Sequence, residues 1–304
     1  MLVEAEGHTV FEHYYHSSLS TSRDVDSGGI ALAEGRLGSV DQTLAELLPT
    51  YASSMKPGIA ATSLRQVLTA TAGFAGDTGS AGGDFAASDD WTRAILDGTA
   101  RPAGEAFGHS DGGAHLLSAI LVQATGQSVL SYARAKLFDP LGIKTRPSVE
   151  RLPAGPDISL YKKAAFAWPL DPQGRQLGWA LLKLRPRDMA KLGMLYLNEG
   201  RWHGKQVVPA AWVRQSTVNQ LGSVPTRSAS GDGYGYLWWT GNADGDPEYL
   251  AYGFAGQMIE VIPRRHLVIV VSTELELDDP DGFGVRAGQL RYLAESVIAP
   301  VFRR

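Results

Sequence analysis

Strand-like runs stand at both ends of this chain, and helical patterns fill the stretch between them. Residues 2–5 and 9–15 are rich in apolar and aromatic side chains, and the pair Glu6-Gly7 between them fits a turn. The last third carries four β-rich runs, at 234–239, 248–254, 257–262 and 266–271, the last two joined by Pro263-Arg264-Arg265. Strands at both ends predict a mixed α/β fold with one sheet, in which the first and last strands are neighbours. A helical subdomain is inserted between them.

Helix-capping residues mark the starts of several helices in the middle of the chain. Ser39 begins the short helical pattern SVDQTLAELLP, and Thr62 or Ser63 can cap the helix that follows. Asp89 stands before DWTRAILDG as a further cap. The most amphipathic run covers residues 112–126. These signals predict a largely helical middle.

The helical part ends with Pro186, which fits the first turn of a helix because its missing N–H costs nothing there. A closing helix is expected over about residues 282–297. We therefore expect a single domain over residues 1–304. Its sheet is drawn from roughly residues 1–30 and 230–300, and its helical subdomain from roughly residues 60–200.

Composition excludes several classes of function. The 304 residues carry a formal net charge of −4, so no basic field exists to hold nucleic acid. The absence of cysteine excludes disulfides, thiol nucleophiles and zinc–thiolate sites. No run approaches the roughly 20 apolar residues of a membrane helix, and no signal peptide is visible at MLVEAEGHTV. A cytoplasmic protein without a membrane or nucleic-acid partner is the expectation.

Five longer stretches carry a resemblance to a known family. They are residues 29–49, 62–74, 112–143, 184–213 and 251–273. In this order the chain resembles the serine β-lactamase and penicillin-binding-protein superfamily. Within it, the closest likeness is to the class C β-lactamase-related branch of carboxylesterases, 6-aminohexanoate-dimer hydrolases and D-alanyl carboxypeptidase-like proteins. The resemblance implies a β-lactamase/transpeptidase-like antiparallel sheet flanked by helices. It also implies a serine hydrolase of esters or amides that needs no cofactor and no metal.

The family's first catalytic element is degraded in this sequence. Relatives use a Ser-x-x-Lys pair, in which lysine helps to remove the serine proton. Ser27 stands near the expected position of the nucleophile, but the helix after it is short, and the first lysine of the chain is Lys56. A second register, Ser20-x-x-Arg23, offers only an arginine, which does not act as a base near neutral pH. The resemblance therefore implies impaired activity.

The family's other two elements are altered. His109-Ser110-Asp111 occupies the place of a Tyr-x-Asn motif, so His109 is a candidate base. Asp111 is a candidate proton-transfer group or, alternatively, the cap of the helix that follows. The place of the Lys/His-x-Gly strand is taken by Ala251-Tyr252-Gly253. By resemblance the substrate-binding residues are Ser110, Tyr252, Gly253, Gly256 and Gln257, with the glycines alternatively forming only a bulge.

Rival motifs have weaker support. Residues 108–112 spell Gly-x-Ser-x-Gly, the nucleophile elbow of α/β-hydrolases, which would make Ser110 the nucleophile. That motif needs a buried strand before it, and the preceding residues 99–105 contain Pro102 and Gly104, which do not suit one. Two further Ser-x-x-Lys strings, ending at Lys56 and Lys162, lie away from the family position.

Three classes of function remain open. The first is a serine hydrolase acting on a small-molecule ester or amide. The second is an inactive homologue that keeps the cleft as a binding site, and the third is a truncated product without a function of its own. Substrate identity and oligomeric state are not encoded in these patterns.

Overall fold

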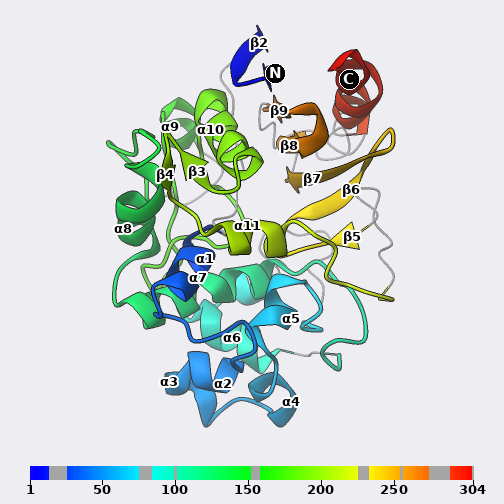
Figure 1. Ribbon diagram of the computed structural model, residues 1–304. Helices are drawn as coiled ribbons and strands as arrows, with labels where there is room; N and C mark the ends of the chain where they lie inside the picture. The colour runs from blue at the N-terminus through cyan, green and yellow to red at the C-terminus, as the bar shows by residue number, and fades with distance from the viewer. Residues whose placement is uncertain are drawn as a thin grey trace.

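The computed structural model describes residues 1–13, 26–74, 84–98, 101–151, 158–224, 233–253, 256–273 and 288–302. Across these residues an antiparallel sheet runs in the order β2-β1-β9-β8-β7-β6-β5 (Figure 1). Its strands are β1 (Leu2–Ala5), β2 (His8–Glu12), β5 (Gly233–Tyr234), β6 (Trp239–Ala243), β7 (Asp246–Tyr252), β8 (Met258–Ile262) and β9 (Leu267–Val271). A small separate ribbon joins β3 (Arg201–Trp202) and β4 (Lys205–Gln206).

The N-terminal hairpin joins the two ends of the chain in one sheet. Glu6 and Gly7 both have positive φ angles, 52° and 78°, and form the turn between β1 and β2. β1 pairs with β9 along its whole length, with Leu2 opposite Val270. The predicted neighbourhood of first and last strands is therefore confirmed. The mixed α/β class with a helix-flanked antiparallel sheet is confirmed as well.

The expected strand over residues 234–239 is wrong, because the chain turns in the middle of that run. β5 ends at Tyr234 and β6 begins at Trp239, and the two pair as a hairpin. Leu237 has a φ of 60°, and its N–H donates to the carbonyl of Leu68 rather than to a strand. A run of aromatic residues thus conceals a tight turn that is held by a distant helix.

The helices fill the middle of the chain. They are α1 (Asp26–Ala33), α2 (Leu44–Leu47), α3 (Pro49–Ala52), α4 (Pro57–Ala60), α5 (Leu64–Leu68), α6 (Trp91–Asp97), α7 (Asp111–Thr125), α8 (Val129–Ala133), α9 (Ser159–Lys163), α10 (Pro186–Leu197) and α11 (Ala210–Ser216). Ser63 caps α5 and Pro186 opens α10, as predicted. In Figure 1, α2, α3 and α4 lie at the end of the molecule opposite β2.

Two predicted helix starts are shifted. The helix expected from Ser39 begins only after Thr43, which forms a capping box with Glu46. The Ser39 hydroxyl instead accepts a hydrogen bond from the Asp41 N–H, closing a turn. α6 is capped by Asp90 rather than by Asp89.

The two faces of the sheet are covered by different helices. α10 packs on one face, where a side chain at Gly193 would collide with Val268 and Ile259. An ion pair of 2.7 Å between Arg187 of α10 and Glu12 of β2 extends this contact to the sheet edge. The C-terminal helical segment, defined here as residues 288–302, covers the opposite face, where Arg291 reaches Glu248.

In the described residues, no single helix is long and apolar enough to cross a membrane. Only α7 taken together with Val129–Phe138, at a bend of 73°, reaches that length and composition. Most of α7 is buried inside the fold.

Two adjacent glycines in α1 have opposite surroundings. A side chain on Gly29 would lie 2.3 Å from the Trp212 ring of α11, whereas one on Gly28 would meet nothing within 4 Å. Gly29 is therefore required by the close packing of α1 against α11, and Gly28 is not.

These surroundings predict opposite effects of the same substitution at neighbouring positions. Gly28→Ala should stabilise the fold by about 0.4–1 kcal/mol, because it restricts only the unfolded chain. Gly29→Ala should destabilise it by about 1–3 kcal/mol through overpacking against Trp212. Urea unfolding of both variants beside the unmodified protein measures the difference. Equal shifts of the same sign would contradict the assigned packing.

Candidate active site

The stretch His109-Ser110-Asp111 lies at the start of the long buried helix α7. Ser110 is the residue before the helix, and its hydroxyl accepts a 3.0 Å hydrogen bond from the Gly113 N–H. Asp111 is the first helical residue, where a carboxylate is favoured by the positive end of the helix dipole. The alternative in which Asp111 caps the helix is therefore wrong by one position, and Ser110 is the cap.

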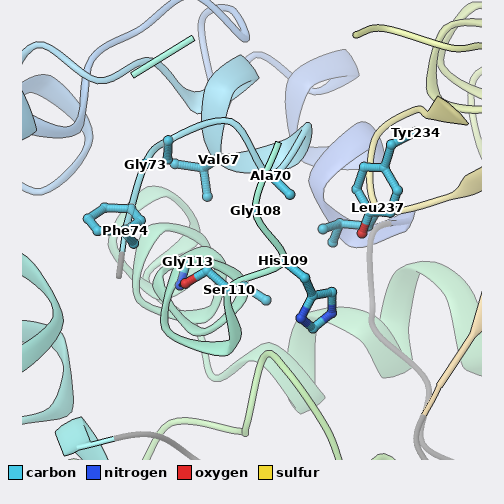
Figure 2. Close-up of a pocket in the computed structure, with 12 residues that line it drawn as sticks. Val67, Ala70, Gly73, Phe74, Gly108, His109, Ser110, Gly113, Tyr234 and Leu237 are labelled. Atoms are coloured by element: carbon cyan, nitrogen blue, oxygen red, sulfur yellow. The ribbon is translucent and has the colours of Figure 1, made fainter. Parts of the chain in front are cut away.

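His109 stands at the mouth of a cavity beside this helix start. Its side chain is 42% exposed, and its Nδ1 lies 3.8 Å from the Asp111 carboxylate, which is too long for a hydrogen bond. The cavity is a shallow hollow, with about 300 Å³ of space between its lining atoms when open solvent is included and room for the centres of water-sized molecules of only about 10 Å³. Apolar residues form most of its wall, among them Val67, Phe74 and Leu237 (Figure 2). An imidazole at the mouth of an apolar cavity can accept a proton from a group bound there.

Ser110 does not form a nucleophile–base pair with its neighbour His109. Figure 2 shows the Ser110 hydroxyl and the His109 ring pointing away from each other. Residues 101–110 contain no strand, and Gly104 and Gly108 donate backbone hydrogen bonds to the turn at residues 70–71. The strand that a nucleophile elbow requires is thus absent from this described stretch.

Ser27 is completely buried in the first turn of α1. Gly28, the next residue, lines an apolar cavity together with Leu64, Ile120 and Trp212. The cavity at His109 is lined by neither Ser27 nor Gly253. Convergence of these three residues on one cleft therefore remains a prediction. The alternative register Ser20-x-x-Arg23 lies outside the described residues.

The glycines that follow β7 form the connection to β8. The Gly253 N–H donates to the Gln257 carbonyl at 2.9 Å, and the Gly256 N–H donates to the Gly253 carbonyl at 3.2 Å. Gly256 has a φ of 81°, a region that favours glycine. The buried Gln257 side chain donates to the Thr273 carbonyl and accepts from the Thr273 N–H. Gln257 thus joins the start of β8 to the end of β9, and its role toward substrate remains a prediction.

Tyr252 is half-buried at the end of β7. Burial raises the pKa of its phenol, and the nearby charges of Arg291 and Glu295 also act on it. Both of these charged residues belong to the C-terminal helical segment. Tyr252 therefore lies near that segment, and its assignment as a substrate contact remains a prediction.

Two lysines, Lys56 and Lys183, donate hydrogen bonds to carbonyl groups at helix ends. Lys56 donates to the carbonyls of Asp97 and Gly98 at the end of α6. Lys183 is buried and donates to the carbonyls of Tyr161 and Lys162 at the end of α9, and its burial lowers its pKa to about 8. The Ser-x-x-Lys string that ends at Lys56 connects α3 to α4, and the one that ends at Lys162 lies within α9.

One buried polar pair was not expected from the sequence. The His115 Nε2 lies 3.1 Å from an Asp171 carboxylate oxygen, with both side chains fully buried, and its Nδ1 faces the Gly178 N–H at 3.3 Å. This arrangement anchors the loop around residues 171–178 to α7. No local pattern could have revealed it, because its members are far apart in the sequence. Among the described residues no His, Asp or Glu cluster could hold a metal ion.

The sheet, its inserted helices and the altered motifs together define a fold of the serine β-lactamase and penicillin-binding-protein type. The Beta-lactamase family model matches residues 28–292, so the chain belongs to the β-lactamase family. That match begins one residue after Ser27. No curated protein sequence matches the chain.

Solved structures share the fold at low sequence identity. A protein from Bacillus anthracis, provisionally described as a 6-aminohexanoate-dimer hydrolase, is 18% identical with a TM-score of 0.66, covering 98% of this chain and 79% of its own. The octameric penicillin-binding protein homologue from Pyrococcus abyssi is 17% identical with a TM-score of 0.65, covering 96% and 72%. A β-lactamase from Mycobacterium bovis is 18% identical with a TM-score of 0.60, covering 98% and 94%.

The capping role of Ser110 predicts a specific loss of stability. Ser110→Ala removes the acceptor of the Gly113 N–H and should cost about 0.5–2 kcal/mol in unfolding free energy. Ser110→Asp keeps an acceptor at the same place and should retain most of that energy. Thermal or urea unfolding of the two variants tests the assignment. Equal stability of Ser110→Ala and the unmodified protein would show that the cap contributes nothing.

Proposed function

We propose that this chain is a serine hydrolase of the β-lactamase family, acting on ester or amide bonds with strongly impaired turnover. Family membership supports the reaction class. The observation that carries the impairment is the absence of any lysine before Lys56. A serine hydroxyl needs a base within hydrogen-bond reach, roughly 2.6–3.2 Å, to attack a carbonyl efficiently.

The lysine is missing in every register upstream of α1. The stretch before α1 contains Ser17, Ser18, Ser20 and Ser22. Three positions after these four serines stand serine, threonine, arginine and valine, respectively. The residue three positions after Ser27 is Ile30. No serine of this region therefore has the lysine partner that the family chemistry uses.

His109 is the remaining candidate base. It is partly exposed at the mouth of an apolar cavity, and the imidazole group titrates near neutral pH. A positioned general base contributes about 10²–10⁴-fold to a rate. Without the lysine, His109 is the group that would have to supply this factor.

A second candidate function is ligand binding at the hollow beside His109. An inactive homologue that binds a small ester, amide or carboxylate would need the His109 cavity and no nucleophile. A binding protein of this kind would take up butyrate or butyramide with a shift of the His109 ring resonances, whether or not any ester is cleaved. A truncated product without function would show neither binding nor a cooperative unfolding transition.

Restoring the lysine tests the proposed impairment directly. Hydrolysis of p-nitrophenyl butyrate by the unmodified protein should be near background, with no β-lactam turnover. Thr21→Lys and Arg23→Lys place a lysine three residues after Ser18 and Ser20, respectively. If Ser18 or Ser20 is the nucleophile, the substitution in its register should raise the rate by at least about 10²-fold and the other should not; if Ser27 is the nucleophile, neither should.

Matched serine variants identify the nucleophile. The gain from Thr21→Lys should vanish when combined with Ser18→Ala, and the gain from Arg23→Lys when combined with Ser20→Ala. Mass-spectrometric mapping of a fluorophosphonate label then names the reactive serine. Fast turnover by the unmodified protein would contradict the impairment. If that turnover were lost in Ser27→Ala, Ser27 would be the nucleophile despite its burial. Loss of turnover in Ser110→Ala alone would instead support Ser110 as the nucleophile of a nucleophile elbow.

A further inference from the structure

Two glutamates are buried next to each other in the middle of the sheet. Glu260 lies on the central strand β8 with no exposed surface, and Glu248 lies on the adjacent strand β7 with 3% exposed. Leu250 stands opposite Glu260 in the β7–β8 register, so Glu248 is its diagonal neighbour on the same face. This is the face opposite α10, because Ile259 and Val261 alternate with Glu260 and Ile259 faces Gly193 of α10.

Few charged groups face Glu260 in this position. Those that act on it are Glu248 beside it, and Glu295 and Arg291 on the C-terminal helical segment. Arg291 lies 3.8 Å from Glu248 and is also paired with Glu295. Arg291 is the single guanidinium among these groups and faces three carboxyl groups, and within the described residues Glu260 receives no ion pair of its own.

Two ionised carboxylates cannot hydrogen-bond to each other, because both are acceptors only. A hydrogen bond between Glu248 and Glu260 exists only when one of them carries a proton. Burial, and then the negative charge of Glu248, raise the pKa of Glu260 well above its usual value. Without that proton, the fully buried Glu260 carboxylate would have neither a donor nor a counter-ion among the described residues.

We propose that Glu248 and Glu260 share one proton at neutral pH, and that this proton keeps the C-terminal helical segment docked on the sheet. Loss of the proton would place two adjacent negative charges beneath that segment. Their repulsion and their need for water are both relieved when residues 288–302 move away. The pair therefore acts as a pH-sensitive latch, with the segment docked at low pH and released at high pH.

The direction of the pH effect follows from proton linkage. A carboxyl group whose folded pKa lies above its unfolded value of about 4.3 binds more protons in the folded state. Its contribution to stability is present at low pH and is lost as pH rises toward the folded pKa. Over that range the folding equilibrium constant should fall by up to about tenfold per pH unit.

Glu260→Gln provides the main test, because glutamine has the shape of the protonated acid and can donate permanently to Glu248. Unfolding is measured for the unmodified protein and for the variant from about pH 5 to about pH 9, so that all other groups cancel in the comparison. The ratio of the two folding constants should shift in favour of the variant by up to about tenfold per pH unit. A ratio that is constant over this range would overturn the proposal.

Hydrogen–deuterium exchange locates the response. After correction for intrinsic exchange rates, protection of residues 288–302 in the unmodified protein should fall at high pH, while that of α10 should fall less. In Glu260→Gln both should be independent of pH. If α10 and residues 288–302 lost protection equally, the proton would stabilise the whole fold and the latch would be wrong.

A second variant serves if Glu260→Gln does not fold. Glu295 is partly exposed on the C-terminal helical segment, and its charge raises the pKa of Glu260. Glu295→Gln removes that charge and should therefore lower the pKa of Glu260. The fall in protection of residues 288–302 should then begin at a lower pH than in the unmodified protein. An unchanged or higher onset would contradict the proposed proton sharing.

Discussion

The packing of α7 fixes most of the helical part of this protein. The helix is buried along much of its length and contacts α1, α2, α5, α6 and α8. Ser110 caps this helix and Asp111 begins it, so the position of His109 follows from the packing of the core rather than from the loop before it. The inward-facing His115 adds a polar anchor one turn further along, through its pair with Asp171. The candidate site is thus built at the start of a largely buried helix.

Much of the fold could be predicted from periodicity and from turn residues. The N-terminal hairpin, α7, α10 and the β8–β9 pair all follow from local patterns that tertiary contacts do not override. Two elements were predicted at the wrong place, because a distant contact or a competing local hydrogen bond decides the structure there. Leu237 breaks a strand-like run because its N–H bonds to Leu68 on a distant helix. Ser39 does not cap a helix because its hydroxyl already closes a turn with Asp41.

The candidate site was less predictable than the fold. The sequence places His109 and Ser110 at the start of α7. It does not show whether the Ser110 hydroxyl or the Asp111 carboxylate accepts from the first helix N–H groups, because that depends on backbone angles. The burial of Ser27 and the bonds from Gln257 to Thr273 depend on packing between segments far apart in the chain. The joint position of Ser27, His109 and Gly253 stays a prediction.

The ladder between β1 and β9 has a consequence for the order in which this protein can fold. Residue 2 pairs with residue 270, so β1 cannot find its partner until almost the whole chain has been synthesised. At about 5–20 residues per second, synthesis of the 304 residues takes roughly 15–60 s. Until β9 has been made, Leu2 and Val3, which are buried in the finished sheet, can pair only with β2. The helices can assemble as they emerge, whereas the nascent hairpin must be kept from pairing with other chains until β9 arrives.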